Sequence, residues 1–267
     1  MTEARGAATF RTAAPEAYDR HVGRYSNLLG AELVRFAGVE RGQRALDVGC
    51  GPGALTRALA ERLGAAAVAA VDPTAPFVEA CRARVAGADV RHGSAEALPF
   101  DDGAFDAVVS QLVVNFMTDA PAGVREMRRV ARPGGTVAAC VWDYADGMTL
   151  LRAFWDAARE VDRAGAAARD EGRVMRWCTP AELDELWTGA GLRDVRGGEL
   201  SVEARYASFG ELWEPLEAGV GPAGAFAAAL DPERRAALRE ELHRRLGAPD
   251  GPFALDARAW AVTGRVP

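Results

Sequence analysis

An aspartate followed by three alternating glycines lies near residue 50. The order is Asp47, Gly49, Gly51 and Gly53, between a short apolar run and a helix predicted over 54–63. Glycine lacks a Cβ, so the backbone of such a turn can approach a bulky polar ligand closely. The free N–H groups at the start of the following helix point to the same place. A fixed carboxylate beside this turn favours a ligand that carries a cationic amino group.

The same glycines also fit a dinucleotide fingerprint, so two ligand classes compete. Gly49, Gly51 and Ala54 satisfy G-x-G-x-x-G/A, and Asp72 follows at the spacing of a ribose-binding acid. A pyrophosphate is itself negative and gains nothing from Asp47, whereas a methionine-like amino group does. The carboxylate therefore favours the amino-group ligand, and a nicotinamide-dependent oxidoreductase is the alternative.

Composition narrows the class of protein. The chain has 267 residues, 49% apolar and 26% charged, with a net charge of −6; this indicates a globular protein and disfavours nucleic acid, which usually needs a basic face. No lysine is present, which is typical of a GC-rich bacterial genome and excludes Schiff-base chemistry. We expect no membrane span and no signal peptide. The four cysteines and three histidines lack metal-ligand spacing, so we expect no metal. None of the cysteines forms a C-x-x-C pair, so we expect reduced thiols and a cytoplasmic location.

Alternating strands and helices must position the glycine turn. Continuously apolar runs predict five buried strands with helices between them, which indicates a doubly wound, mostly parallel α/β sheet covered on both faces. The predicted strands are 44–48, 67–71, 88–91, 105–110 and 136–142.

Two more strands are predicted near the C-terminus, at 192–200 and 257–264, with two helices between them. We see no linker that would divide the chain, so we expect a single domain over 1–267. Within it we expect an N-terminal lid helix at 15–37, a ligand-binding core at 38–143 and a helical insertion at 200–256.

Four segments in order resemble the class I S-adenosylmethionine (SAM) dependent methyltransferases of the small-molecule, type 11-like family. They are 47–53, 71–73, 93–100 and 132–135, and the resemblance covers most of 15–143. It implies a Rossmann-like seven-stranded sheet with an antiparallel last strand and helical cap elements. It also implies SAM as the cofactor and S-adenosylhomocysteine (SAH) as the product.

The resemblance assigns the methionine end of the cofactor to the glycine turn. Asp47 and Gly49 match the positions that hold the amino group, the glycine through its carbonyl. Gly51 and Gly53 match the positions of close approach, with Cys50 between them.

The ribose and one face of the adenine match residues after the second predicted strand. Asp72 matches the acid that binds the ribose hydroxyls through charge-assisted hydrogen bonds. Pro73 and Phe77 match apolar positions that sandwich the adenine; a core position in its helix is the alternative for Phe77.

The adenine edge matches a loop at residues 94–96. Ser94 stands where the family commonly has Asp, so a neutral and weaker acceptor replaces a charged one. Ala95 and Glu96 complete the loop, and a helix-capping role is the alternative for Glu96. Gln111, at the end of the fourth strand, matches a position beside the sulfonium and carboxylate of the cofactor.

The acceptor side is less defined, because a sulfonium is already electrophilic and the protein mainly needs to hold a nucleophile in line with its methyl group. The catalytic residues are unknown; the candidates are Asn115, Asp143, Tyr144 and His21. Tyr18 is expected to bind the cofactor from the lid helix. The alternatives are a turn-forming Asp143, a surface His21 and a packing role for Tyr18.

We therefore expect methyl transfer from SAM to a small, fairly apolar metabolite, through an O, N or C acceptor that the sequence does not resolve. An aromatic region after residue 150 and an acidic net charge favour a small acceptor over nucleic acid or membrane. Three alternatives remain: a SAM-binding enzyme that catalyses a non-methylating rearrangement or cyclisation, an NAD(P)-dependent oxidoreductase, and a non-catalytic SAM-binding module.

Overall fold

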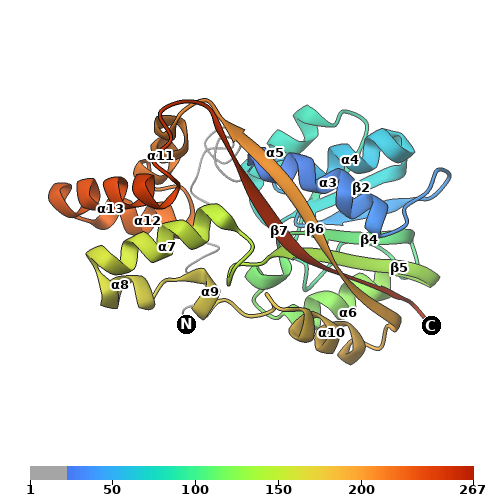
Figure 1. The fold of residues 1–267 in the computed structure, drawn as a ribbon. Coiled ribbons are helices and arrows are strands. Elements are labelled where there is room, and N and C mark those ends of the chain that lie inside the picture. Colours follow the sequence, from blue (N-terminus) through green and yellow to red (C-terminus); the bar gives the residue numbers. More distant parts are fainter. Residues whose placement is uncertain (1–22) are drawn as a thin grey trace. The chain divides into compact units, whose positions relative to one another are not determined.

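The computed structural model describes residues 23–267, so Tyr18, His21 and the first part of the predicted lid helix, residues 15–22, lie outside the described residues (Figure 1). The described chain divides into two compact units. Among the described residues, the first contains 23–25, Trp142–Met175 and Ser201–Arg258, and the second contains Ser26–Val141, Arg176–Leu200 and Ala259–Pro267.

The sheet has seven strands in the order β3-β2-β1-β4-β5-β7-β6. They are β1 (Ala45–Val48), β2 (Val68–Asp72), β3 (Asp89–His92), β4 (Phe105–Gln111), β5 (Ala131–Trp142), β6 (Arg193–Tyr206) and β7 (Phe253–Arg265). The first five pair in parallel. β7 runs antiparallel to β5, because Gly134 N donates to Val266 O while Asp143 N donates to Arg258 O further along. The predicted fold class is confirmed.

Helices cover both faces of the strands in the second unit. These helices are α3 (Arg24–Phe36, which begins in the first unit), α4 (Ala54–Leu63), α5 (Ala75–Arg84), α6 (Ala120–Val130) and α10 (Pro180–Gly189). On one face, residues of α6 and α10 join the strands in a large apolar core, where Trp187 Nε1 donates to Val137 O at 3.0 Å. On the other face, Cys81 and Val78 of α5 pack with Cys50 and Ala70. Burial on both faces explains why these strands are continuously apolar.

The first unit is mainly helical. Its helices are α7 (Thr149–Val161), α8 (Arg163–Ala167), α9 (Glu171–Val174), α11 (Phe209–Glu217), α12 (Gly221–Ala229) and α13 (Pro232–Arg245). Phe154, Trp155 and Phe226 make edge-on ring contacts there, with centroids 5.1 to 6.2 Å apart. Much of the aromatic region expected after residue 150 is therefore core.

Two details between the last strands differ from the prediction. Three helices lie there rather than two; α12 was missed because its sequence, GPAGAFAAA, has no amphipathic period. β6 continues to Tyr206, six residues beyond the predicted end, because Leu200, Ala204 and Tyr206 keep an even spacing that buries one side of the strand.

Glu171 is a fully buried acid in the first unit. Its Oε2 accepts a hydrogen bond from Trp155 Nε1 at 2.7 Å. The pKa of Glu171 is raised to about 7, mainly because the side chain is buried. The charge of Asp170 contributes to this rise, whereas the hydrogen bond from Trp155 and the charge of Arg152 oppose it. The folded state therefore holds this proton more tightly than the unfolded state, so stability is lost as the pH rises from about 4.5 through 7.

We expect Glu171→Gln to remove this loss, because the amide keeps an acceptor for Trp155 without a charge. The variant should be more stable than the wild type by about 2–3 kcal/mol at pH 8 and equal to it below pH 4.5. Urea unfolding at both pH values measures the difference. The exposed Glu61→Gln is the control, with a change within about 0.5 kcal/mol. A Glu171→Gln variant no more stable than the wild type at pH 8 contradicts the ionisation argument.

Candidate cofactor-binding site

The glycine turn joins β1 to α4 at the carboxyl end of the parallel strands. Gly49 N and Cys50 N both donate to Val71 O, at 2.8 and 3.0 Å, which ties the turn to β2. The φ angles of Gly49, Gly51 and Gly53 are 79°, 52° and 101°, so the backbone of all three glycines lies in the left-handed region. Gly53 caps α4 without a side-chain hydrogen bond, and the first N–H groups of this helix therefore have no side-chain cap there.

The space around each glycine differs. A Cβ on Gly49 would lie 2.5 Å from Val113 Cγ2, and a Cβ on Gly53 would lie 3.1 Å from Cys81 Sγ. A Cβ on Gly51 would meet no heavy atom of the described structure within 4 Å. The turn is thus packed against protein at its two ends and open at its centre, as a cradle for a ligand requires.

Asp47 lies in β1, two residues before Gly49, and is fully buried. Its Oδ2 accepts a hydrogen bond from Thr56 Oγ1 at 2.6 Å, whereas Oδ1 has no donor within the described part of the chain. Burial raises the pKa of Asp47 to about 8; the Thr56 hydrogen bond opposes this shift, and Cys81 and Asp72 add to it. A buried carboxylate oxygen without a donor fits a cationic amino group, which would supply the missing hydrogen bond and charge.

Asp72 is the last residue of β2, and its side chain is hydrogen-bonded to the glycine turn. Its Oδ2 accepts from Gly51 N at 2.9 Å and its Oδ1 accepts from Thr74 N at 2.8 Å. Each carboxylate oxygen has a second lone pair, so these bonds are compatible with a bound diol. The ribose role of Asp72 stays a prediction, and the structure adds that this side chain holds the central glycine in place.

The residues expected around the adenine follow β2 and β3. Pro73 is exposed and Phe77 is buried in α5, 6% exposed. Glu96 Oε1 accepts from the backbone N–H groups of Thr118 and Asp119, at 2.9 and 3.3 Å, just before α6. Burial opposes ionisation, but the hydrogen bonds from Ser94 and these amides outweigh it and hold the pKa of Glu96 below its usual value. This geometry favours the capping alternative for Glu96.

The loop itself is compact. Ser94 Oγ donates to Glu96, and Ser94 forms an isolated antiparallel bridge with Ala97. Ala95 is buried, 9% exposed, and packs in the large core of the second unit. The roles of Ser94 and Ala95 at the adenine edge remain predictions.

The end of β4 lies beside the glycine turn. Gln111 Nε2 donates to Ser26 O of α3 at 3.0 Å, and Gln111 Oε1 has no donor within residues 23–267. Leu112, directly after it, has a φ of 62°, which is rare for a residue with a side chain. This sharp turn precedes Val113, whose side chain packs against Gly49. The packing explains why the first glycine of the motif needs to be a glycine.

The three candidate catalytic residues that the structure describes, Asn115, Asp143 and Tyr144, are divided between the two units. Asp143 is buried in the first unit, where its Oδ2 accepts from Arg258 Nη2 at 2.7 Å and from Gly147 N at 2.9 Å. This favours the turn-forming alternative. Tyr144 is buried in the same unit, and Asn115 is buried in the second unit, in the short helix Val114–Phe116.

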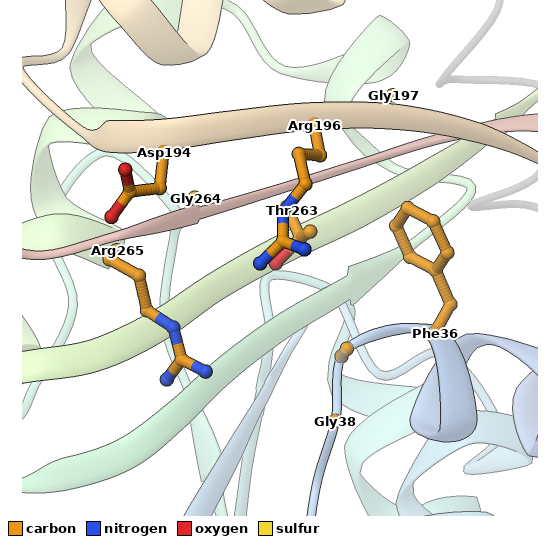
Figure 2. A pocket seen from close by; sticks show the side chains of 9 residues that line it. Phe36, Gly38, Asp194, Arg196, Gly197, Thr263, Gly264 and Arg265 are labelled. Atoms are coloured by element: carbon orange, nitrogen blue, oxygen red, sulfur yellow. The ribbon is translucent and has the colours of Figure 1, made fainter.

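A separate cavity of about 250 Å³ lies in the second unit, beside β6 and β7 (Figure 2). Phe36, Arg196, Thr263 and Arg265 are among the residues that line it. Backbone hydrogen bonds pair Val266 with Gly134 and Gly135, so this part of β7 lies beside the first residues of β5. The cavity is therefore at the amino end of the parallel strands, away from the glycine turn at their carboxyl end, where ligands of such sheets bind.

Two residues of the site were missed from the sequence, Thr56 and Val113. Thr56 is a polar residue on the buried side of α4, between Leu55 and Leu59. A hydroxyl on an apolar helix face nine residues after the motif aspartate is the signal that could have found it. Val113 gives no such signal, because its contact with Gly49 depends on the turn at Leu112.

Two classes of site receive no support from the described residues. No helix in residues 23–267 has the length and apolar character to cross a bilayer. Within the same residues, no group of three or more His, Cys, Asp or Glu side chains has the arrangement of a metal site.

Comparison with known proteins places the glycine turn in a named domain. A family described as a methyltransferase domain matches residues 46–139. Malonyl-[acyl-carrier protein] O-methyltransferase of Erwinia billingiae is 34% identical over 142 residues, which are 53% of this chain and 55% of that protein. Demethylmenaquinone methyltransferase of Roseiflexus castenholzii is 44% identical over 97 residues, 36% of this chain and 41% of that protein. The chain thus spans about half the length, or less, of these curated relatives.

A solved structure extends the likeness in fold. Phosphoethanolamine N-methyltransferase 2 of Haemonchus contortus, in complex with SAH, superposes with a TM-score of 0.55 over 96% of this chain and 61% of that chain. The identity is 17%, so this likeness concerns the fold alone. Residues 46–139 therefore match the methyltransferase domain family, in agreement with the resemblance found in the sequence, and the solved structure shares the fold.

Proposed function

We propose that this protein is a SAM-dependent methyltransferase that acts on a small molecule. The observation that carries the proposal is Asp47 Oδ1, a buried carboxylate oxygen without a donor among the described residues, below an open glycine cradle in a methyltransferase domain. The methionine end of SAM has the cationic amino group that this oxygen lacks.

The residues of the second unit would divide the binding of SAM among them. Asp47 would bind the amino group, and Gly51 would allow close approach of the backbone. Asp72 would hold both the turn and the ribose hydroxyls, and Phe77 would contact the adenine. When bound, SAM supplies an electrophilic methyl group on a sulfonium, so the chain mainly has to hold the acceptor in line with that methyl.

The acceptor we propose is a small, fairly apolar metabolite. The names of the two relatives refer to a malonyl group on a carrier protein and to demethylmenaquinone, which are unlike acceptors. These relatives therefore do not select an acceptor atom for this chain. The proposal rests on the acidic net charge and on the aromatic residues after residue 150 other than the core residues Phe154, Trp155 and Phe226.

The test is calorimetry of SAM, SAH and NADH on the full chain, followed by mass spectrometry of products from a small-molecule acceptor screen. We expect micromolar binding of SAM and SAH, no binding of NADH, and a product heavier by one methylene group with matching release of SAH. Tighter binding of NADH would select the oxidoreductase. A product formed while SAM stays intact would select the non-methylating rearrangement or cyclisation.

A further inference from the structure

We propose that Thr56 is a positioning residue for the cofactor. Its hydroxyl holds one oxygen of Asp47, so that the other oxygen stays free for the amino group of SAM, and Cys81 fixes the direction of that hydroxyl. The inference rests on the proposed function, because it assigns a role in binding the same ligand.

The two oxygens of Asp47 are in different situations. Thr56 Oγ1 lies 2.6 Å from Oδ2, a short distance typical of a hydroxyl that donates to a carboxylate. Oδ1 is buried and has no donor within the described residues. Thr56 stands in the first turn of α4, directly after the glycine turn, and its side chain is fully buried. It thus sets the plane of the carboxylate from the same element that forms the cradle.

A hydroxyl has only one proton, and here it points to Asp47. Thr56 Oγ1 must therefore accept from its other neighbour, Cys81 Sγ, which lies 3.4 Å away on α5. Cys50 and Cys81 pack together in the same small apolar cluster. The Thr56 hydroxyl thus accepts a hydrogen bond from Cys81 and donates one to Asp47. The donated bond favours the ionised form of Asp47, which an ammonium ligand needs.

The surroundings of Asp47 make this donor important. Apart from Thr56, the groups that act on its ionisation are Cys81 and Asp72, and both raise its pKa. Without the Thr56 hydroxyl, the backbone of Thr56 would be the remaining hydrogen-bond donor that favours the charged form of Asp47 among the described residues. Binding of a cation would then require a higher pH and would be weaker at neutral pH.

Thr56→Val removes the hydroxyl with little change in volume. We expect the Kd for SAM at pH 7 to rise about tenfold or more, and the pH dependence of binding to move upward by about one unit. Thr56→Ser keeps a donor and should restore both the affinity and the pH profile. A role in packing alone would leave the pH profile unchanged.

The control is Thr136→Val, at a buried threonine of β5 outside the candidate site, which should leave Kd and pH profile unchanged. Thermal unfolding of each variant checks folding, and Thr56→Ala, which also lacks the hydroxyl, keeps the test open if Thr56→Val does not fold. Thr56→Val with the affinity and pH profile of the wild type would overturn the positioning role while leaving the proposed function intact. A wild type that does not bind SAM would overturn both.

Discussion

Asp47→Asn is expected to raise the Kd for SAM about 100-fold while the protein stays folded. The amide can still accept the hydrogen bond from Thr56, but it offers no charge to the amino group of the ligand. Removing one member of a buried, hydrogen-bonded charge pair costs binding on this scale. Calorimetry with SAM and SAH measures the loss, and thermal unfolding without ligand shows that the fold is kept.

The pH dependence separates this explanation from a packing effect. Because the pKa of Asp47 is raised to about 8, about nine-tenths of the unliganded protein carries a proton on this side chain at pH 7. Binding of an ammonium must release that proton, so the affinity of the wild type should rise about 50-fold between pH 6 and pH 8, about tenfold over the first pH unit and about fivefold over the second.

Asp47→Asn should lose this slope, and proton release should disappear from calorimetry in buffers of different ionisation enthalpy. If the wild-type affinity is independent of pH over this range, or if Asp47→Asn binds SAM normally, Asp47 does not hold the amino group.

Gly49→Ala is expected to lower the free energy of unfolding by about 3 kcal/mol or more. The added Cβ would lie 2.5 Å from Val113 Cγ2, and the φ of 79° is unfavourable for any residue with a Cβ. The left-handed backbone costs about 1–2 kcal/mol and overpacking adds about 1–3 kcal/mol. Urea unfolding without ligand measures the change.

Gly51→Ala is the matched control, because the same substitution two residues later has a positive φ of 52° but meets open space. We expect it to cost only about 1–2 kcal/mol of stability. Its methyl group would project into the cradle, so SAM affinity should fall while the fold is kept. Equal losses of stability in the two variants would show that the contact with Val113 does not explain why position 49 requires a glycine.

The sequence predicted the frame of the site because that frame depends on local signals. Continuous apolar runs predicted the five parallel strands, and most of the predicted strand ends differ from the observed ends by only a few residues. Alternating glycines after Asp47 gave the left-handed turn, since few other residues adopt that backbone. The last strands were less well placed: β6 was cut short at its alternating, half-exposed end, and the all-apolar α12 was missed.

Tertiary structure alone decided how the site residues are partnered. Thr56 follows Asp47 by 9 residues, and Cys81 follows Thr56 by 25 residues. Only the packing of α4 and α5 against β1 and β2 brings the three side chains into one hydrogen-bonded chain. The burial of Glu171 beside Trp155 arises in the same way.

Composition and periodicity determine which residues turn inward, because burial of apolar surface follows the pattern of each strand and helix. They do not determine which buried polar groups meet, because those contacts join residues that are distant in the sequence. For this protein, the sequence by itself therefore determined the strand pattern and the ligand-sized glycine turn. The structure decided that one oxygen of Asp47 is held by Thr56 and that the other has no donor among the described residues.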